Sequence, residues 1–157
     1  MRIGFGFDAH RLVEGRTFVL GGVEIDASFG AQGHSDADVL AHAVADALLG
    51  AAALGDLGAH YLSSDARWKD ADSMKLLGEC AAEVQHAGYT IQNVDATVIV
   101  EAPKLARYVA QMRDRIAEVL GIANTQVSVK AKSTDGLGFT GDGSGIAASA
   151  VALIEPL

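Results

Sequence analysis

DADVLAHAVADALLGAAAL, residues 36–54, carries apolar side chains at the three- and four-residue spacing of an α-helix. The positions that share this spacing are Val39, Leu40, Ala43, Ala47 and Leu48. Ser35, directly before the run, has the chemistry of a helix N-cap, because its hydroxyl can accept from a free backbone N–H. We therefore predict a helix over residues 36–54, capped by Ser35.

Strands are expected on both sides of this helix. Before it, residues 2–7, 18–20 and 23–25 are strand-like, and the last two flank Gly21-Gly22 as in a hairpin. After it, strands are expected at residues 94–100, 127–132 and 146–154.

Further helices are expected over residues 73–87, between Asp72 as cap and Gly88 as stop, and beyond Pro103, where a helix should begin. This last helix ends at Gly121. Its apolar face carries Leu105, Val109, Met112, Ile116 and Leu120. The order of elements favours an α+β fold, with helices packed on one face of a single mixed β-sheet, over a regular doubly wound sheet.

The composition limits the classes of partner. With 157 residues the chain suits one domain over residues 1–157 and is too short for two ordinary ones. Its formal net charge is −8 and its pI is near 4.9, which argues against nucleic acid and anionic membrane as partners. A phosphorylated ligand must therefore be held by local cations.

The single cysteine, Cys80, cannot form an internal disulfide and falls on an apolar helical stripe, so we expect it in the core. The N-terminus runs straight into a strand, and no apolar stretch reaches membrane-spanning length without a charge. The expected location is the cytoplasm.

Asp8-Ala9-His10 places two potential metal ligands on the same side of an extended segment. Alone this pattern is weak, and a strand-end carboxylate that orients a surface histidine is the more frequent explanation. His42 adds a third ligand from an apolar helix, although a satisfied core histidine is the commoner case. Asp38 and Asp46 lie one turn either side of His42, so one of these carboxylates could orient its second ring nitrogen. Two nitrogens and one oxygen suit zinc and leave a fourth position open.

The segment of residues 33–38 stands at the start of the predicted helix. Free amide groups and the helix dipole would make it an anion site, with His34 and Ser35 as additional donors. A Ser-x-x-Asp capping arrangement is the structural alternative, and both can hold because a capped terminus can still present the His34 side chain. The Gly-rich stretch of residues 136–145 is expected to be a loop that a ligand or another chain approaches closely, or a simple turn.

Over essentially its whole length the chain resembles the 2-C-methyl-D-erythritol 2,4-cyclodiphosphate synthase family. The matching pieces, in order, are GFGFDAH (4–10), HSDAD (34–38), His42, DALLGAAALGD (46–56), NVD (93–95), APK (102–104) and LGFTG (137–141). Each piece is modest by itself, whereas their order and spacing together are specific.

The resemblance implies a homotrimer whose sheets face the three-fold axis, with active sites at subunit boundaries. One chain would bring the metal and its neighbour the cytidine pocket. The reaction would convert 4-diphosphocytidyl-2-C-methyl-D-erythritol 2-phosphate into the cyclic diphosphate and CMP. Zinc would bind Asp8, His10 and His42, magnesium or manganese would take Asp135, and His34 and Ser133 would stabilise the transferring group.

The resemblance also implies a substrate-binding set drawn from five parts of the chain. Its members are Asp8, Ala9, His10, His34, Ser35, Asp56, Leu57, Gly58, Tyr61, Asp65, Val100, Glu101, Ala102, Pro103, Lys104, Leu105, Ala106, Ala131, Lys132, Ser133, Thr134, Asp135 and Phe139.

The sequence departs from the family pattern at three places. Asp135 replaces the usual glutamate, Ser63 replaces an acid in the loop that follows Tyr61, and Asp142 replaces a basic residue. An aspartate should repel phosphate-bearing isoprenoids, so we hypothesise that the protein lacks such a ligand at the trimer axis. Two rival functions stay open: a zinc phosphohydrolase that activates water, and a non-catalytic nucleotide-binding trimer.

Overall fold

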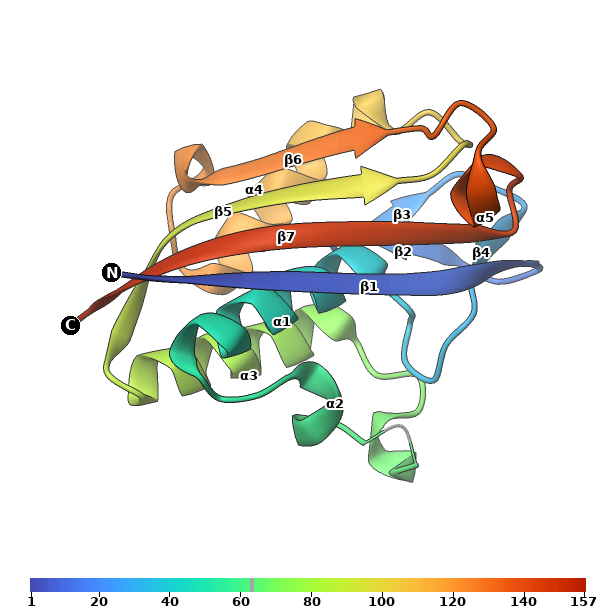
Figure 1. The fold of residues 1–157 in the computed structure, drawn as a ribbon. Coiled ribbons are helices and arrows are strands. Elements are labelled where there is room, and N and C mark those ends of the chain that lie inside the picture. Colours follow the sequence, from blue (N-terminus) through green and yellow to red (C-terminus); the bar gives the residue numbers. More distant parts are fainter. Residues whose placement is uncertain (63) are drawn as a thin grey trace.

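The computed structural model describes residues 1–62 and 64–157 and has an α+β fold (Figure 1). Five strands form a mixed sheet in the order β4-β1-β7-β5-β6, in which only β5 and β6 run parallel. Their bounds are β1 Arg2–Glu14, β4 Phe29–Ala31, β5 Tyr89–Ile99, β6 Val127–Lys132 and β7 Gly145–Pro156. The main helices lie on one face of this sheet, as predicted (Figure 1).

The predicted hairpin is present as a separate two-stranded sheet of β2 (Phe18–Leu20) and β3 (Val23–Ile25). Strand β4 was not predicted, and β1 and β5 are longer than expected, ending at Glu14 and beginning at Tyr89. The reason is pairing: β7 pairs with β5 from Tyr89 and with β1 as far as Arg11, and β4 pairs with the last three residues of β1, so residues without a strand pattern are held extended.

Helix α1 (Val39–Ala52) is the central helix and lies against β1 and β7. Its residues are almost all buried, in agreement with the apolar run of residues 36–54. Strand β1 approaches it closely because Gly4 and Gly6 have no side chain; a Cβ at either position would collide with a carbonyl oxygen of α1.

The predicted start of this helix is wrong by three residues, and so is its cap. Ala37 has a left-handed φ of 56°, and α1 begins only at Val39, with Asp38 as N-cap. The fully buried Asp38 carboxylate accepts from the N–H of Ala41 (3.0 Å) and from those of Gly21 (2.9 Å) and Gly22 (2.8 Å). One carboxylate thus caps α1 and ties the β2–β3 turn to it, a role that Ser35 does not share.

Helix α3 (Ser73–His86) is confirmed with its predicted cap, since the Asp72 carboxylate accepts from the N–H of Met74 at 2.9 Å. Helix α4 (Val109–Leu120) ends at Gly121, as predicted, but begins six residues after Pro103. The intervening residues form a loop and the 3-10 helix η2 (Ala106–Tyr108).

Short elements complete the fold: α2 (Leu57–His60), η1 (Ala66–Trp68), η3 (Asn124–Gln126) and α5 (Gly138–Gly141). Cys80 is buried on α3, as expected, and burial raises the pKa of its thiol to about 12. Within the described residues, no helix is long and apolar enough to cross a membrane.

The face of the sheet opposite α1 carries exposed apolar side chains. On β1, Ile3, Phe5 and Phe7 are 70%, 65% and 52% exposed, and on β7 Val151, which pairs with Phe5, is 41% exposed. These four residues, called here the apolar sheet face, form a contiguous group because paired residues on neighbouring strands project to the same side. Large exposed groups of this kind mark interaction sites.

Candidate metal centre and nucleotide pocket

Asp8, His10 and His42 meet at one point between β1 and α1. Asp8 and His10 are two residues apart on β1, so both project toward the helix, from which His42 points back. The Asp8 Oδ2 lies 2.8 Å from His10 Nε2 and 2.9 Å from His42 Nδ1, and the two ring nitrogens are 3.4 Å apart. Among the described residues, this is the group of ligand atoms close enough to share a metal ion.

Each histidine has a second partner that fixes which ring nitrogen faces the centre. His10 Nδ1 lies 2.9 Å from the Gln32 carbonyl oxygen, which can only accept, so Nδ1 carries the proton. His42 Nε2 lies 2.8 Å from Ser73 Oγ, whose hydroxyl donates to Asp36 and therefore accepts from His42. When the two rings are neutral, both histidines thus direct an unprotonated nitrogen to the centre, as metal binding requires.

The expected orienting role of Asp38 and Asp46 is wrong. The Asp38 carboxylate is occupied by the three backbone groups described above, and that of Asp46 accepts from the N–H of Leu57 at 2.7 Å. Ser73 and Gln32, which do orient the histidines, are distant in the sequence and carried no pattern that could have identified them.

Electrostatics favour a charged Asp8. Burial raises its pKa, but hydrogen bonds from His10 and His42, together with their positive charge, outweigh this and leave it well below the usual value. Burial lowers the pKa of His42, but the Asp8 carboxylate raises it by more, so the pKa lies above its usual value. One carboxylate oxygen and two imidazole nitrogens converging from three positions fit a zinc ion with an open fourth position.

Replacing Ser73 with alanine is expected to weaken metal binding about 10–100-fold, because His42 loses the acceptor that fixes its tautomer. A competition titration against a chromophoric chelator measures the affinity. Ser28→Ala, which removes an exposed hydroxyl, is the control and should bind zinc as the unmodified chain does. Equal zinc affinity of the Ser73→Ala and unmodified chains would contradict this role.

His34 lies beside the centre in the irregular residues 32–38. Helix α1 begins at Val39, and Asp38 caps it by accepting from the N–H of Ala41, so residues 33–38 precede the helix; that they bind an anion stays a prediction. The His34 side chain is instead held by the Asp65 carbonyl oxygen, 3.1 Å from Nε2, which must therefore carry the proton. The Ser35 hydroxyl lies 3.3 Å from His42 Nε2.

A cavity of about 290 Å³ opens where the strands β5 and β6 end. Its lining contains all but one of residues 100–106, together with Ala131, Lys132 and Ser133, which agrees with the segments expected to hold cytidine. Ala102 is the member of the first segment that is absent from the lining. Lys104 and Lys132 give this pocket local positive charge in an acidic chain.

The remaining predicted site residues belong neither to the metal centre nor to the lining of the 290 Å³ cavity. Asp135 has a left-handed φ of 51° and is exposed, as is Phe139, and Asp135 does not join the ligand cluster of Asp8 among the described residues. The Thr134 hydroxyl donates to the Leu137 carbonyl (2.7 Å) and lies 2.8 Å from that of Thr140.

Short hydrogen bonds hold the predicted residues between α1 and α3. Asp56 caps α2, accepting from the N–H of Ala59 at 2.8 Å, and Leu57 and Gly58 form its first turn. Tyr61 donates to Glu79 at 2.8 Å, and the Asp65 carboxylate pairs with Arg67. The substitution at Ser63 lies outside the described residues.

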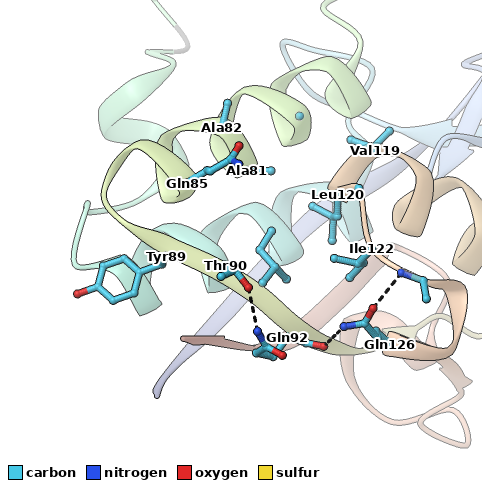
Figure 2. A pocket seen from close by; sticks show the side chains of 14 residues that line it. Ala81, Ala82, Gln85, Tyr89, Thr90, Gln92, Val119, Leu120, Ile122 and Gln126 are labelled. Atoms are coloured by element: carbon cyan, nitrogen blue, oxygen red, sulfur yellow. Dashed lines mark hydrogen bonds between the residues drawn. The ribbon is translucent and has the colours of Figure 1, made fainter. Parts of the chain in front are cut away.

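A larger hollow of about 630 Å³ lies between α3, α4 and the start of β5 (Figure 2). No acidic, basic or histidine side chain lines it. Several of its polar groups bind one another: Gln92 donates to Thr90 at 2.8 Å, and Gln126 donates to the Gln92 carbonyl at 2.6 Å and accepts from Ala123 N–H at 2.9 Å (Figure 2). The larger cavity therefore lacks groups for metal binding or acid–base chemistry.

Comparison with known proteins agrees with this geometry, since residues 1–155 match the YgbB family. The chain belongs to that family. A curated member, the 2-C-methyl-D-erythritol 2,4-cyclodiphosphate synthase of Salinibacter ruber, is 60% identical over 99% of both chains. The predicted family and the predicted synthase function are thereby confirmed.

Solved structures of family members share the fold. The bifunctional IspDF from Campylobacter jejuni is 38% identical with a TM-score of 0.96; the match covers 99% of this chain and 42% of that one. A 2C-methyl-D-erythritol-2,4-cyclodiphosphate synthase solved with CDP bound is 33% identical with a TM-score of 0.90, over 98% of this chain and 100% of that one.

Proposed function

We propose that the protein cyclises 4-diphosphocytidyl-2-C-methyl-D-erythritol 2-phosphate, a reaction in which the substrate's 2-phosphate attacks its own β-phosphorus and CMP leaves. The observation that carries the proposal is the convergence of Asp8, His10 and His42 with both rings oriented for metal. No water is consumed, so the activity is that of a phosphorus–oxygen lyase.

The residues of the centre would act by neutralising charge and holding geometry. Two phosphate groups repel each other, so catalysis depends on positioning and electrostatic stabilisation rather than on a protein nucleophile. Asp8, His10 and His42 would hold zinc, which when bound supplies positive charge to phosphate oxygens. His34, whose ring is held by the Asp65 carbonyl oxygen, would lie next to the transferring group.

Cytidine recognition is assigned to the 290 Å³ cavity. Its walls combine backbone groups of residues 100–106, suited to reading the edge of a base, with the ammonium groups of Lys104 and Lys132. The CDP-bound family member, which has the same fold, supports a cytidine nucleotide as ligand. Ser133, at the rim of the cavity, would contact the phosphate, and Asp135 would hold a magnesium or manganese ion through its carboxylate.

We infer a homotrimer because of the apolar sheet face. Phe5 and Phe7 expose more than half of their surface in the single chain, which is unusual for aromatic side chains unless a partner covers them. Packing three such faces around an axis buries them and brings the metal centre of one chain to the cytidine pocket of the next.

Replacing Phe7 with glutamate is expected to convert the trimer to single chains and to remove turnover, since it buries a charge in the proposed interface. Sedimentation equilibrium should change from three times the 16.2 kDa chain mass to that mass alone. The control is Gln111→Glu, an exposed position on α4, which should stay trimeric and active. A trimeric, active Phe7→Glu variant would show that this face is not the interface.

Incubation with the cytidine substrate, followed by phosphorus NMR, tests the function. The expected products are CMP and the cyclic diphosphate, and a zinc chelator should stop the reaction. A zinc phosphohydrolase with the same ligands would release an uncyclised phosphate product instead. Either that product or turnover indifferent to chelators would overturn the proposal.

A further inference from the structure

His34 lies in a segment that is itself neither helix nor strand. Residues 32–38 are neither helix nor strand, since β4 ends at Ala31 and α1 begins at Val39. The carbonyl of His34 accepts from Asp70 at 2.8 Å, and its ring is tied to the Asp65 carbonyl. Because these contacts are single hydrogen bonds to a neighbouring loop, something else must fix the peptide planes on either side of His34.

Arg16 makes that contact. It lies in the turn between β1 and β2, and its guanidinium donates from Nη1 to the Gly33 carbonyl at 3.2 Å and from Nη2 to the Ser35 carbonyl at 3.1 Å. These carbonyls belong to the residues directly before and after His34. A planar guanidinium holds two acceptors in a fixed relation, which determines where the His34 Cα and Cβ point.

The charge of Arg16 is also not neutralised. No ion pair joins it to a carboxylate in the part of the chain that the structure describes, and both of its hydrogen bonds are to neutral, half-buried carbonyls. The full positive charge of the Arg16 guanidinium therefore lies next to the loop that carries His34. In a chain with a net charge of −8, it favours the approach of phosphate groups to this loop.

We propose that Arg16 is a positioning residue for the cyclisation. It fixes the backbone on both sides of His34 by binding the carbonyls of Gly33 and Ser35, and it adds positive charge next to the phosphate site. The inference rests on the proposed function, in which His34 contacts the transferring phosphate. Arg16 itself donates to the backbone and acts on the reaction only through His34 and through its charge.

Two substitutions separate the effect of the two guanidinium hydrogen bonds of Arg16 from the effect of its positive charge. Arg16→Met removes both and is expected to lower kcat about 30-fold, because a small displacement of a catalytic side chain is costly. Arg16→Lys keeps the charge but cannot bind both carbonyls in the same way, so a loss of about three- to tenfold is expected. Arg115→Met and Arg115→Lys, on the exposed side of α4, are the matched controls and should keep wild-type kcat.

Three further measurements distinguish positioning from a general structural role. Zinc content, CMP affinity and melting temperature should stay at the wild-type value in Arg16→Lys, because neither the ligand triad nor the cytidine cavity touches Arg16. Loss of these properties in parallel with kcat would overturn the inference, as would an unchanged kcat in Arg16→Met. If Arg16→Met does not fold, the Arg16→Lys series alone decides.

Nitrogen NMR of the His34 ring keeps the test independent of turnover. The unmodified protein should show one set of signals with the proton on Nε2, whereas Arg16→Lys should show broadened or doubled signals. Identical His34 signals in both would overturn the inference. Absence of cyclisation by the unmodified protein would instead overturn the proposed function, with the His34 signals still deciding the role of Arg16.

Discussion

Replacing His42 with alanine is expected to abolish zinc binding and to lower turnover about a thousandfold. Removing one of three ligands loses charge stabilisation of about 4 kcal/mol, and each 1.36 kcal/mol corresponds to a factor of ten in rate. The Asp8 carboxylate also loses its neighbour at 2.9 Å, the His42 Nδ1, which donates to it when the ring is protonated, so it is less well compensated against burial. Zinc content by atomic absorption and CMP release in the cyclisation assay measure the two effects.

The control for this variant is His86→Ala, since His86 is an exposed histidine at the end of α3. It should retain both zinc and activity. A His42→Ala protein that is folded by circular dichroism, retains zinc and still turns over substrate would remove His42 from the metal centre. If it loses zinc and melts earlier while turnover persists, the metal has a structural role, as the nucleotide-binding alternative requires of it.

Replacing Gly6 with alanine is expected to prevent folding or to destabilise the protein by about 4 kcal/mol or more. A Cβ at this position would collide with the carbonyl oxygen of Ala43 and come within 2.7 Å of the Ala47 N–H nitrogen, and both are backbone atoms of α1. The strand and the helix would have to separate, which would expose core surface and move Asp8 away from His42. Urea unfolding followed by circular dichroism gives the free energy of unfolding.

Gly50→Ala, on helix α1, is a control for which the free energy of unfolding should change in the opposite direction. Its Cβ would meet no atom closer than the Phe5 carbonyl oxygen at 4.0 Å, and its φ is not left-handed. Alanine in a helix interior is favoured over glycine by about 0.5–1 kcal/mol, so this variant should be slightly more stable. A Gly6→Ala protein as stable as the Gly50→Ala protein would show that β1 and α1 are not in close contact.

Local pattern was sufficient for most of the fold. The apolar spacing in residues 36–54 predicted the central helix, and Asp72 with Gly88 predicted both ends of α3, because caps and stops depend on side chains within a few residues. It was insufficient where strands are held by distant partners. Strand β1 continues to Glu14 because β7 and β4 pair with it, and no pattern in its second half indicates that.

In the metal centre, too, local sequence pattern predicted some features and missed those that depend on distant residues. Spacing placed Asp8 and His10 on one side of a strand, and the position of His42 inside an apolar helix made it the third candidate ligand. The resemblance added residues 100–106, most of which line one cavity in the structure. The expectation that Asp38 or Asp46 would orient His42 failed because both carboxylates were assigned by sequence proximity alone. Asp38 is instead a cap bound to Gly21 and Gly22.

The sequence by itself determined which side chains are available: two histidines and an aspartate with ligand chemistry, an apolar helix to carry one of them, and an acidic chain with few local cations. Only the tertiary structure decided which of them meet. His42 contacts Asp8 across 34 residues and Ser73 across 31, and Arg16 reaches the Ser35 carbonyl across 19. Such contacts depend on how closely β1 packs on α1 and on where α3 begins, and pairing over those distances leaves no periodic trace in the chain.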